Sequence, residues 1–383
     1  MTRGKKIAFA LELILLASAV SSSAQAVTVL HSFSGTDGAA PWAPPVFDKA
    51  GNLYGTTSGG NGTAFRLSKD GTFTTLYRFL GGTDGAVPMG SLVLDAAGNL
   101  YGTTADGGGT CGSFDCGIVF KISASGTESV LHVFAGGNDG YGPEGGLVAD
   151  ASGNLYGTTN LGGGTACGGI GCGTVFKLAP DGTESILHAF SDGNDGGVPG
   201  CSLLLDKNGN LYGTTQVGGN SNKGSVFEVS HDGAEKVLYS FKGGDDGAQP
   251  IAGVVMDSSG NIYGTTINEG PYGGGTVFKL APDGTETVLH SFSGGQDGYA
   301  PYGTLIVDAV GEMYGVTEGG GHRKGVVFKI SSSGDEQILY AFGHHGSDGS
   351  FPLFGLTARR NSLYGTTFYG GPSNAGVIYR LKK

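Results

Sequence analysis

The chain has 383 residues, of which 14% are charged and 10% are aromatic, and its formal net charge is −11. A chain with this many aromatic residues and so few charges buries a core, which excludes intrinsic disorder. The acidic balance disfavours nucleic acid and anionic membranes as partners, because both would be repelled.

The N-terminal segment, residues 1–26, has the pattern of a secretory signal peptide. Arg3, Lys5 and Lys6 form a basic region, residues 7–20 are mostly apolar, and residues 24–26 (AQA) resemble a cleavage site. The apolar run, interrupted by Glu12, is too short to span a bilayer. We expect cleavage after Ala26, a secreted or periplasmic product and no membrane insertion. Loss of three basic residues and one acidic residue would change the net charge from −11 to −13.

One phrase, LYGTT or a close variant, recurs seven times after this leader. Its copies begin at Leu53, Leu100, Leu155, Leu211, Ile262, Met313 and Leu363. The copies are therefore nearly evenly spaced along the chain. A period of about fifty with strand-like content is typical of propellers and similar arrays.

Each repeat contains four strand-like segments, as the fifth repeat illustrates. Its segments are residues 253–260, 261–266, 275–280 and 285–292, separated by Gly, Pro, Asn and Asp. Those four residue types favour tight turns, and short strands joined by tight turns pair antiparallel. We therefore expect an all-β fold over residues 27–383, a seven-bladed β-propeller with four antiparallel strands per blade.

The two ends of this region carry complementary strands. Residues 27–33 (VTVLHSF) match a fourth strand with no blade before it, and residues 376–381 (GVIYRL) match a third strand with no fourth strand after it. We expect the N-terminal strand to complete the last blade, which would cover a sheet edge that could otherwise recruit another chain. We also expect a monomer.

Four cysteines bracket equivalent loops of neighbouring repeats. Cys111 and Cys116 have four residues between them, and so have Cys167 and Cys172. In an exported protein this arrangement favours two local disulfides. A four-thiolate zinc site is the alternative, although the spacing does not match common zinc motifs. Cys201 is left over and is expected to be a buried free thiol.

Several polar residues recur at one position in most repeats, which indicates packing rather than catalysis. A histidine or tyrosine recurs in the VLHSF segment, first as His31, and is expected between blades. Lys121 and its equivalents are expected opposite Glu128 and its equivalents across a two-residue hairpin loop with a bulge.

The signature Asp-Gly-x-x-Pro, first at residues 37–41, predicts a turn between blades held by the Asp side chain. Calcium binding is the alternative for this signature.

Function is expected where the repeats differ. The residue after each of these prolines varies and should line the mouth of the channel: Trp42, Met89, Glu144, Gly200, Ile251, Tyr302 and Leu353. The variable loops between second and third strands, which carry Tyr272 and His322, share this face. Trp42 and Tyr302 suit stacking on a sugar or contact with a peptide, the alternative being that they only plug the channel. Our candidate ligand-binding residues are Trp42, Glu144, Tyr302, Tyr272 and His322.

The motifs LYGTT, GTVFKL, DGTETVLHSF and DGxxP resemble the Gloeo/Verruco (GloVer) tandem-repeat family of secreted bacterial proteins. The resemblance covers residues 27–383. It implies export and no defined activity. Members of that family carry sorting anchors after the repeats, whereas this sequence ends at Lys383 directly after the last strand. The element at residues 95–101 also resembles NHL-type and streptogramin-lyase-type propellers.

Two classes of function remain open at this level. The first is a non-catalytic binding or scaffold module, with a glycan or an extracellular protein held on the variable-loop face. The second is a propeller enzyme of lyase or lactone-hydrolase type with its site at the channel mouth. The polar clusters His322-Arg323-Lys324 and His344-His345 are its candidate catalytic groups. No catalytic residue is assigned, and no metal or cofactor is expected.

Overall fold

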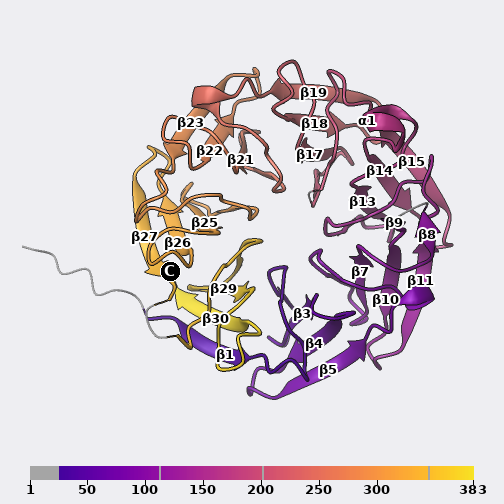
Figure 1. Ribbon diagram of the computed structural model, residues 1–383, viewed down its shortest axis with the longest axis vertical. Helices are drawn as coiled ribbons and strands as arrows, with labels where there is room; N and C mark the ends of the chain where they lie inside the picture. The colour runs from indigo at the N-terminus through magenta and orange to yellow at the C-terminus, as the bar shows by residue number, and fades with distance from the viewer. Residues whose placement is uncertain (1–25, 112–113, 201, 344–345) are drawn as a thin grey trace, which may run out of the picture.

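The computed structural model, which describes residues 26–111, 114–200, 202–343 and 346–383, arranges seven four-stranded antiparallel sheets as blades around a central axis (Figure 1). The chain is a seven-bladed β-propeller, as the repeat predicts. Residues 1–25, where the leader is predicted, lie outside the described part. No helix within that part is long and apolar enough to cross a membrane.

The two strands nearest the axis in each blade are a short first strand and the LYGTT strand. The first strands of blades one to seven are β2 (Val46–Phe47), β6 (Val93–Leu94), β12 (Val148–Ala149), β16 (Leu204–Leu205), β20 (Val255–Met256), β24 (Ile306–Val307) and β28 (Thr357–Arg359). The second strands are β3 (Leu53–Thr57), β7 (Leu100–Thr104), β13 (Leu155–Thr159), β17 (Leu211–Thr215), β21 (Ile262–Thr266), β25 (Met313–Thr317) and β29 (Ser362–Thr367).

The third and fourth strands form the outer half of each blade. The third strands are β4 (Thr63–Leu67), β10 (Ile118–Ile122), β14 (Thr174–Leu178), β18 (Ser225–Val229), β22 (Thr276–Leu280), β26 (Val326–Ile330) and β30 (Val377–Lys382). The outermost strands are β5 (Phe73–Arg78), β11 (Glu128–Val133), β15 (Glu184–Ala189), β19 (Glu235–Ser240), β23 (Glu286–Ser291), β27 (Glu336–Ala341) and β1 (Thr28–Ser32). Small elements outside the blades are β8 (Thr110–Cys111), β9 (Phe114–Asp115), α1 (Ala166–Gly169) and two 3-10 turns, Gly82–Asp84 and Gly244–Asp246.

The ring closes through its two ends, as predicted. Strand β1 is the outermost strand of blade seven and pairs antiparallel with β30, with Thr28 opposite Arg380 and Ser32 opposite Val377. The indigo N-terminal strand and the yellow C-terminal strand lie side by side in Figure 1. The Phe33 amide continues the pairing with a 3.0 Å hydrogen bond to the Gly376 carbonyl oxygen. The outward edge of β30 is therefore covered.

Aromatic rings explain why the LYGTT strand carries a glycine. Gly55 pairs with Phe65 across β3 and β4, and a Cβ on Gly55 would lie 2.7 Å from the Phe65 ring. The ring lies over the glycine and meets Phe33 of the preceding blade edge to face, with centroids 5.4 Å apart. An aromatic pair repeats at each of the other interfaces between blades, with the rings of Phe292 and Phe328 tilted at 59° and with Tyr379 in place of the phenylalanine in blade seven. Edge-to-face pairs of this kind add to the burial energy of each interface.

The outer hairpins have a register that differs from the sequence prediction. Lys121 pairs with Ser129, and Glu128 pairs with Ile122, so the predicted Lys121–Glu128 pairing is wrong by one residue. The turn is longer than expected, because Ser123 donates its amide to Thr127 and Gly126, in the left-handed region with φ 88°, donates its amide to Ser123. A one-residue shift moves a side chain to the other face of a strand pair. Glu128 therefore lies on the side of the buried Ile122, between blades.

The recurring His and Tyr rings lie between blades, as predicted, and each meets the aspartate of the following Asp-Gly-x-x-Pro turn. His132 Nε2 lies 3.1 Å from Asp139 Oδ1, and the Ala135 amide donates to Asp139 Oδ2 at 2.6 Å. The Tyr239 hydroxyl donates to Asp246 at 2.8 Å. The aspartate thus fastens the turn to the outer strand, which confirms the predicted structural role of this signature.

One of the two predicted disulfides lies within the described side chains and is confirmed. Cys167 and Cys172 are bonded across the short turn that contains α1, with their Cα atoms 5.4 Å apart. The side chain of Cys111 and all of Cys201 lie outside the described part, so the Cys111–Cys116 bond and the free thiol stay predictions.

Candidate functional site

The Asp-Gly-x-x-Pro turns direct the chain from the rim of one blade to the axis. The residue before each proline has a positive φ: Ala40, Val87, Gly142, Val198, Gln249, Ala300 and Phe351. This region is unfavourable for side chains, so the surroundings must hold it. At Ala300 the amide donates to the Gly274 carbonyl oxygen at 2.8 Å, and its carbonyl oxygen accepts from the Glu318 amide at 3.0 Å. Each turn is thereby tied to its own blade and to the preceding one.

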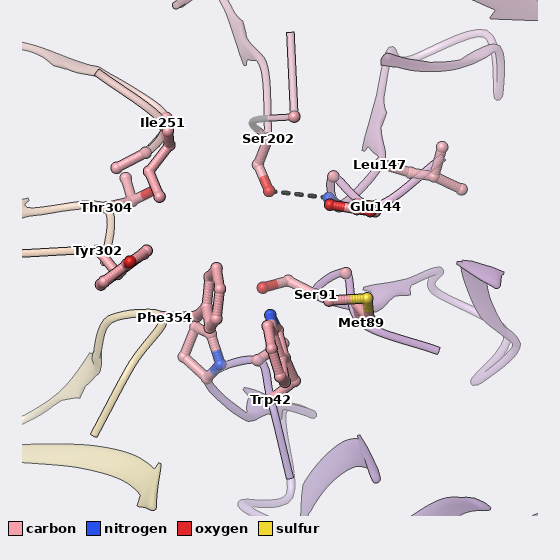
Figure 2. A pocket seen from close by; sticks show the side chains of 18 of the residues that line it. Trp42, Met89, Ser91, Glu144, Leu147, Ser202, Ile251, Tyr302, Thr304 and Phe354 are labelled. Atoms are coloured by element: carbon pink, nitrogen blue, oxygen red, sulfur yellow. Dashed lines mark hydrogen bonds between the residues drawn. The ribbon is translucent and has the colours of Figure 1, made fainter. Parts of the chain in front are cut away.

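A cavity of about 490 Å³ lies where these turns reach the axis. Residues that follow the prolines line it, and Figure 2 shows them around a common space. Six of the seven residues predicted at the mouth are in its lining: Trp42, Met89, Glu144, Gly200, Ile251 and Tyr302. In blade seven the lining residues are Phe354, next to the predicted Leu353, and Leu356.

One wall of this mouth cavity is aromatic. Trp42 stacks on Phe354 with ring centroids 4.7 Å apart and an angle of 26° between the rings. Tyr302 lies tilted beside Phe354, with centroids 6.1 Å apart, and Phe368 meets Trp42 edge to face at 5.0 Å. Blades six, seven and one therefore present a continuous apolar surface to the cavity. Burial raises the pKa of the Tyr302 hydroxyl, with a smaller contribution from Glu318, so this phenol stays protonated and can donate a hydrogen bond.

Polar groups also line the cavity. Glu144 and Ser202 lie across from Trp42 and Phe354, and the Ser91 side chain lies beside Trp42 in this view (Figure 2). The Gly146 amide donates to Ser202 Oγ at 2.9 Å, which orients that hydroxyl at the mouth. The Glu144 side chain is exposed to the solvent in the channel, but protein atoms on the channel walls lie around it and reduce its hydration. Desolvation raises the pKa of its carboxyl, and a hydrogen bond with Asn160 opposes that shift.

The five candidate residues from the sequence fall into two groups. Trp42, Glu144 and Tyr302 come together in the mouth cavity. Tyr272 lies outside its lining, 70% exposed, and its amide donates to Ser291 Oγ at 3.3 Å near the rim. His322 also lies outside the lining and is near Gly343 at the end of the outer strand of blade six. The second histidine cluster, residues 344 and 345, is outside the described part.

Like Ser91 and Ser202, Phe354 is a lining residue that the sequence did not predict. It sits two residues after its proline, where the other blades carry Ala43, Gly90, Gly145, Cys201, Ala252 and Gly303. The residue predicted at the mouth in blade seven was Leu353, directly after the proline. At the position two residues after each proline, Phe354 is the one large ring among small residues. That contrast is the sequence signal that could have predicted Phe354 as a lining residue.

No group of three His, Cys, Asp or Glu side chains in the described part of the chain is arranged to hold a metal ion. The cavity lining supplies aromatic and aliphatic surface, hydroxyls, the amides of Asn160 and Gln216, and the carboxylate of Glu144.

The Gloeobacter/Verrucomicrobia repeat model matches residues 18–204 and 168–379. The chain belongs to the Gloeobacter/Verrucomicrobia repeat family. Its fold is similar to the extracellular domain of a hybrid two-component system of B. thetaiotaomicron, with a TM-score of 0.61 and 10% identity. That match covers 92% of this chain and 39% of the other, so this repeat-family chain spans well under half of that protein.

A structure assigned to a gluconolactonase family is also similar, with a TM-score of 0.46, 14% identity and coverage of 94% and 92% of the two chains. No protein of curated function matches the sequence significantly.

Proposed function

We propose that this repeat-family chain is an exported, non-catalytic binding module that holds an uncharged saccharide at the mouth of the propeller channel. The observation that carries the proposal is the Trp42–Phe354 stack facing Glu144 across a cavity of about 490 Å³. A cavity of this size is within the usual range for small ligands.

The aromatic wall and the polar groups match the two kinds of surface that a sugar ring presents. Its C–H face packs on aromatic rings, and its hydroxyls need hydrogen-bond partners when they leave water. The Trp42, Tyr302 and Phe354 wall supplies the first. The Glu144 carboxylate accepts hydrogen bonds, and the Ser91 and Ser202 hydroxyls can both donate and accept. The net charge of −11 disfavours anionic ligands at a carboxylate-bearing mouth.

Export is supported by two separate features. The segment 1–26 has the signal-peptide pattern, and the Cys167–Cys172 disulfide is of a kind that persists in oxidising compartments. An extracellular or periplasmic module would meet saccharides from cell walls and surrounding polymers.

A glycan and peptide array followed by calorimetry tests the proposal. We expect a saccharide ligand whose affinity falls at least about tenfold in a Trp42→Ala, Tyr302→Ala double variant, because two aromatic contacts are lost. Val310→Ala, an exposed apolar residue in a turn on the opposite face, is the matched control and should bind as the parent does. Tyr272→Ala and His322→Ala show whether the outer loops extend the site.

Two results would replace the proposal. Unaltered binding in the double variant would place the site elsewhere, and binding of peptides alone would make the ligand a protein segment. Turnover of a lactone or polysaccharide that disappears in Glu144→Gln would make the chain an enzyme.

A further inference from the structure

A second cavity, of about 510 Å³, lies at the seam where blade seven meets blade one. Its walls include residues 49–51, together with Ser68, Lys69, Gly71, Arg359, Arg360 and Ser362, in the turns that join first to second strands and third to fourth strands. Strands alternate in direction, so these turns are at the ends opposite the Asp-Gly-x-x-Pro turns. This seam cavity is therefore on the other face from the channel mouth.

The seam cavity is strongly basic although the chain as a whole is acidic. Five cationic side chains line it: Lys49, Lys69, Arg359, Arg360 and Arg380. Its described lining contains no carboxylate, and none of the five forms an ion pair within the described part of the chain. Five neighbouring like charges repel one another, so an anion would be attracted here.

The aspartates that adjoin Lys49 and Lys69 in the chain are hydrogen-bonded within their own turns. Asp48 accepts hydrogen bonds from the Gly51 and Asn52 amides, the Asn52 side chain and the Tyr54 hydroxyl. Asp70 accepts from the Thr72 amide at 2.9 Å. Neither carboxylate therefore neutralises the five cations by direct contact.

Another seam of the same propeller shows that packing does not require these cations. The cavity between blades four and five is also about 510 Å³, and its lining includes Glu228, Pro282 and Asp283. Glu228 pairs with Tyr212 just as Arg380 pairs with Tyr364, so glutamate and arginine occupy equivalent places. Pro282 likewise occupies the place of Lys69 by alignment of the repeats.

Blade seven also lacks the aspartate-led turn that precedes the LYGTT strand in the other six blades. Its turn is a tight hairpin in which Arg359 pairs with Ser362. Arg360, at the start of this turn, has φ 54° and an exposed side chain. The change removes a carboxylate and adds two guanidinium groups at one seam.

Arg359 is held in place before any ligand arrives. Its guanidinium carbon lies 4.9 Å from the centroid of the Phe47 ring, and it packs so closely on Gly51 that a side chain there would collide with it. Tyr364 meets the Phe47 ring edge to face at 4.8 Å. A fixed planar guanidinium presents paired N–H donors with little entropy loss, which suits the two oxygens of a carboxylate, sulfate or phosphate group.

We propose that the seam of blades seven and one is a second binding site, for a ligand that carries an oxyanion group on a small organic body. Arg359 and Arg380, both half-buried, bind the oxyanion. The exposed Lys49, Lys69 and Arg360 attract it from solution. The apolar surface of Phe47 and Tyr364 contacts the body that carries the charge. This site is independent of saccharide binding at the mouth.

Calorimetry with inorganic phosphate, sulfate and glucuronate, at about 10 mM ionic strength, tests the site and identifies which oxyanion it prefers. We expect at least one probe to bind with a stoichiometry of one and to weaken as salt is added. The exposed triple variant Lys49→Gln, Lys69→Gln, Arg360→Gln should fold normally and weaken binding at least about tenfold, because three charges are lost. Arg359→Gln, Arg380→Gln should abolish binding, and if that variant fails to fold the triple variant decides.

Lys236→Gln is the matched control, because Lys236 lines the equivalent cavity between blades four and five. It should leave anion binding unchanged. Absence of binding by all three probes at millimolar concentration would overturn the proposal. So would binding that survives the triple variant, or binding that is lost in the Trp42→Ala, Tyr302→Ala variant of the mouth.

Discussion

At the scale of single residues, the glycine of LYGTT shows how a large ring on one strand restricts the residue paired with it to glycine. In blade four Gly213 pairs with Phe227, and a Cβ on the glycine would lie 2.6 Å from the tip of the Phe227 ring and 3.0 Å from Leu203. Phe227 is completely buried between Gly213 and Phe190 of the preceding blade. The ring has no free volume to move into, so the glycine is needed for packing and not for its backbone freedom.

Gly213→Ala should therefore destabilise the protein by about 1–3 kcal/mol, the usual cost of overfilling a packed core. Gly295→Ala is the control, because its Cβ would contact only the flexible Ser293 and Asp297 side chains, at 3.4 Å or more. We expect the control to change stability by less than about 0.5 kcal/mol. Urea unfolding followed by fluorescence measures both, and equal stability of the two variants would contradict the packing account.

At the scale of elements, strand β1 contributes more than its short length suggests. It supplies the fourth strand of blade seven, and its neighbour Phe33 is 1% exposed and packs on Phe65 of blade one. Without β1 the backbone edge of β30 and the apolar surface under Phe33 would both face water. Open edges with apolar neighbours recruit other chains.

A chain that begins at residue 34 should lose the ring closure and aggregate, whereas a chain that begins at residue 26 should remain monodisperse. Light scattering and a thermal melt compare the two. A truncated chain with the same melting temperature and the same monodispersity as the longer one would show that closure by β1 is unimportant.

The cysteine loops make a separate prediction at this scale. We expect the non-reduced protein to have one free thiol, at Cys201, with Cys111–Cys116 and Cys167–Cys172 bonded. Alkylation under denaturing conditions followed by mass spectrometry counts the thiols. Because the ring closed by Cys167–Cys172 is short, Cys167→Ser, Cys172→Ser should cost no more than about 2 kcal/mol. A count of five free thiols would contradict both disulfides.

At the scale of the whole molecule, half-buried carboxyls recur around the ring. Glu128, Glu184, Glu235, Glu286 and Glu336 begin the outermost strands of blades two to six. Burial raises the pKa of each to about 7, and the aspartate of the preceding Asp-Gly-x-x-Pro turn adds to the shift. The equivalent residues at the two remaining seams are Val27 and Phe73. Five of the seven seams therefore carry a carboxyl whose pKa is raised in this way.

The sign of their effect on stability follows from proton binding. Between the unfolded pKa of 4.5 and the folded pKa of about 7, the folded state binds more protons, so these groups stabilise the fold below pH 4.5 and lose that contribution as pH rises through 7. The pKa of His31, His188 and His290 is lowered by burial, which opposes this trend because it favours the fold at higher pH. A comparison of variants separates the two effects.

Glu286→Gln should reduce the loss of stability between pH 5 and pH 8, and the same change at all five glutamates should reduce it further. Glu269→Gln is the control, because hydrogen bonds with Lys223 and the Gly244 amide lower the pKa of Glu269 and place its titration below this window. Thermal melts across the pH range measure the slopes. A slope for Glu286→Gln identical to that of the parent would show that this carboxyl titrates normally.

Repetition made much of the fold predictable. Because every blade packs in the same way, each strand had seven examples, and the seven blades, their four strands and the β1–β30 closure were all predicted correctly. The same comparison predicted six of the residues that line the mouth cavity. It missed Phe354 because only the position directly after each proline was compared.

The sequence by itself determined the repeating architecture, since periodic turns and alternating apolar residues are local properties of the chain. Only the tertiary structure decided the relations between blades. A single extra residue in the outer hairpins turned Glu128 from its expected lysine partner toward the seam. The cations of the seam cavity come from opposite ends of the chain, Lys49 and Lys69 near its start and Arg380 near its end, and meet only because the ring closes. Side-chain contacts across a closed ring depend on geometry that no local pattern encodes, and both candidate sites of this protein are built from such contacts.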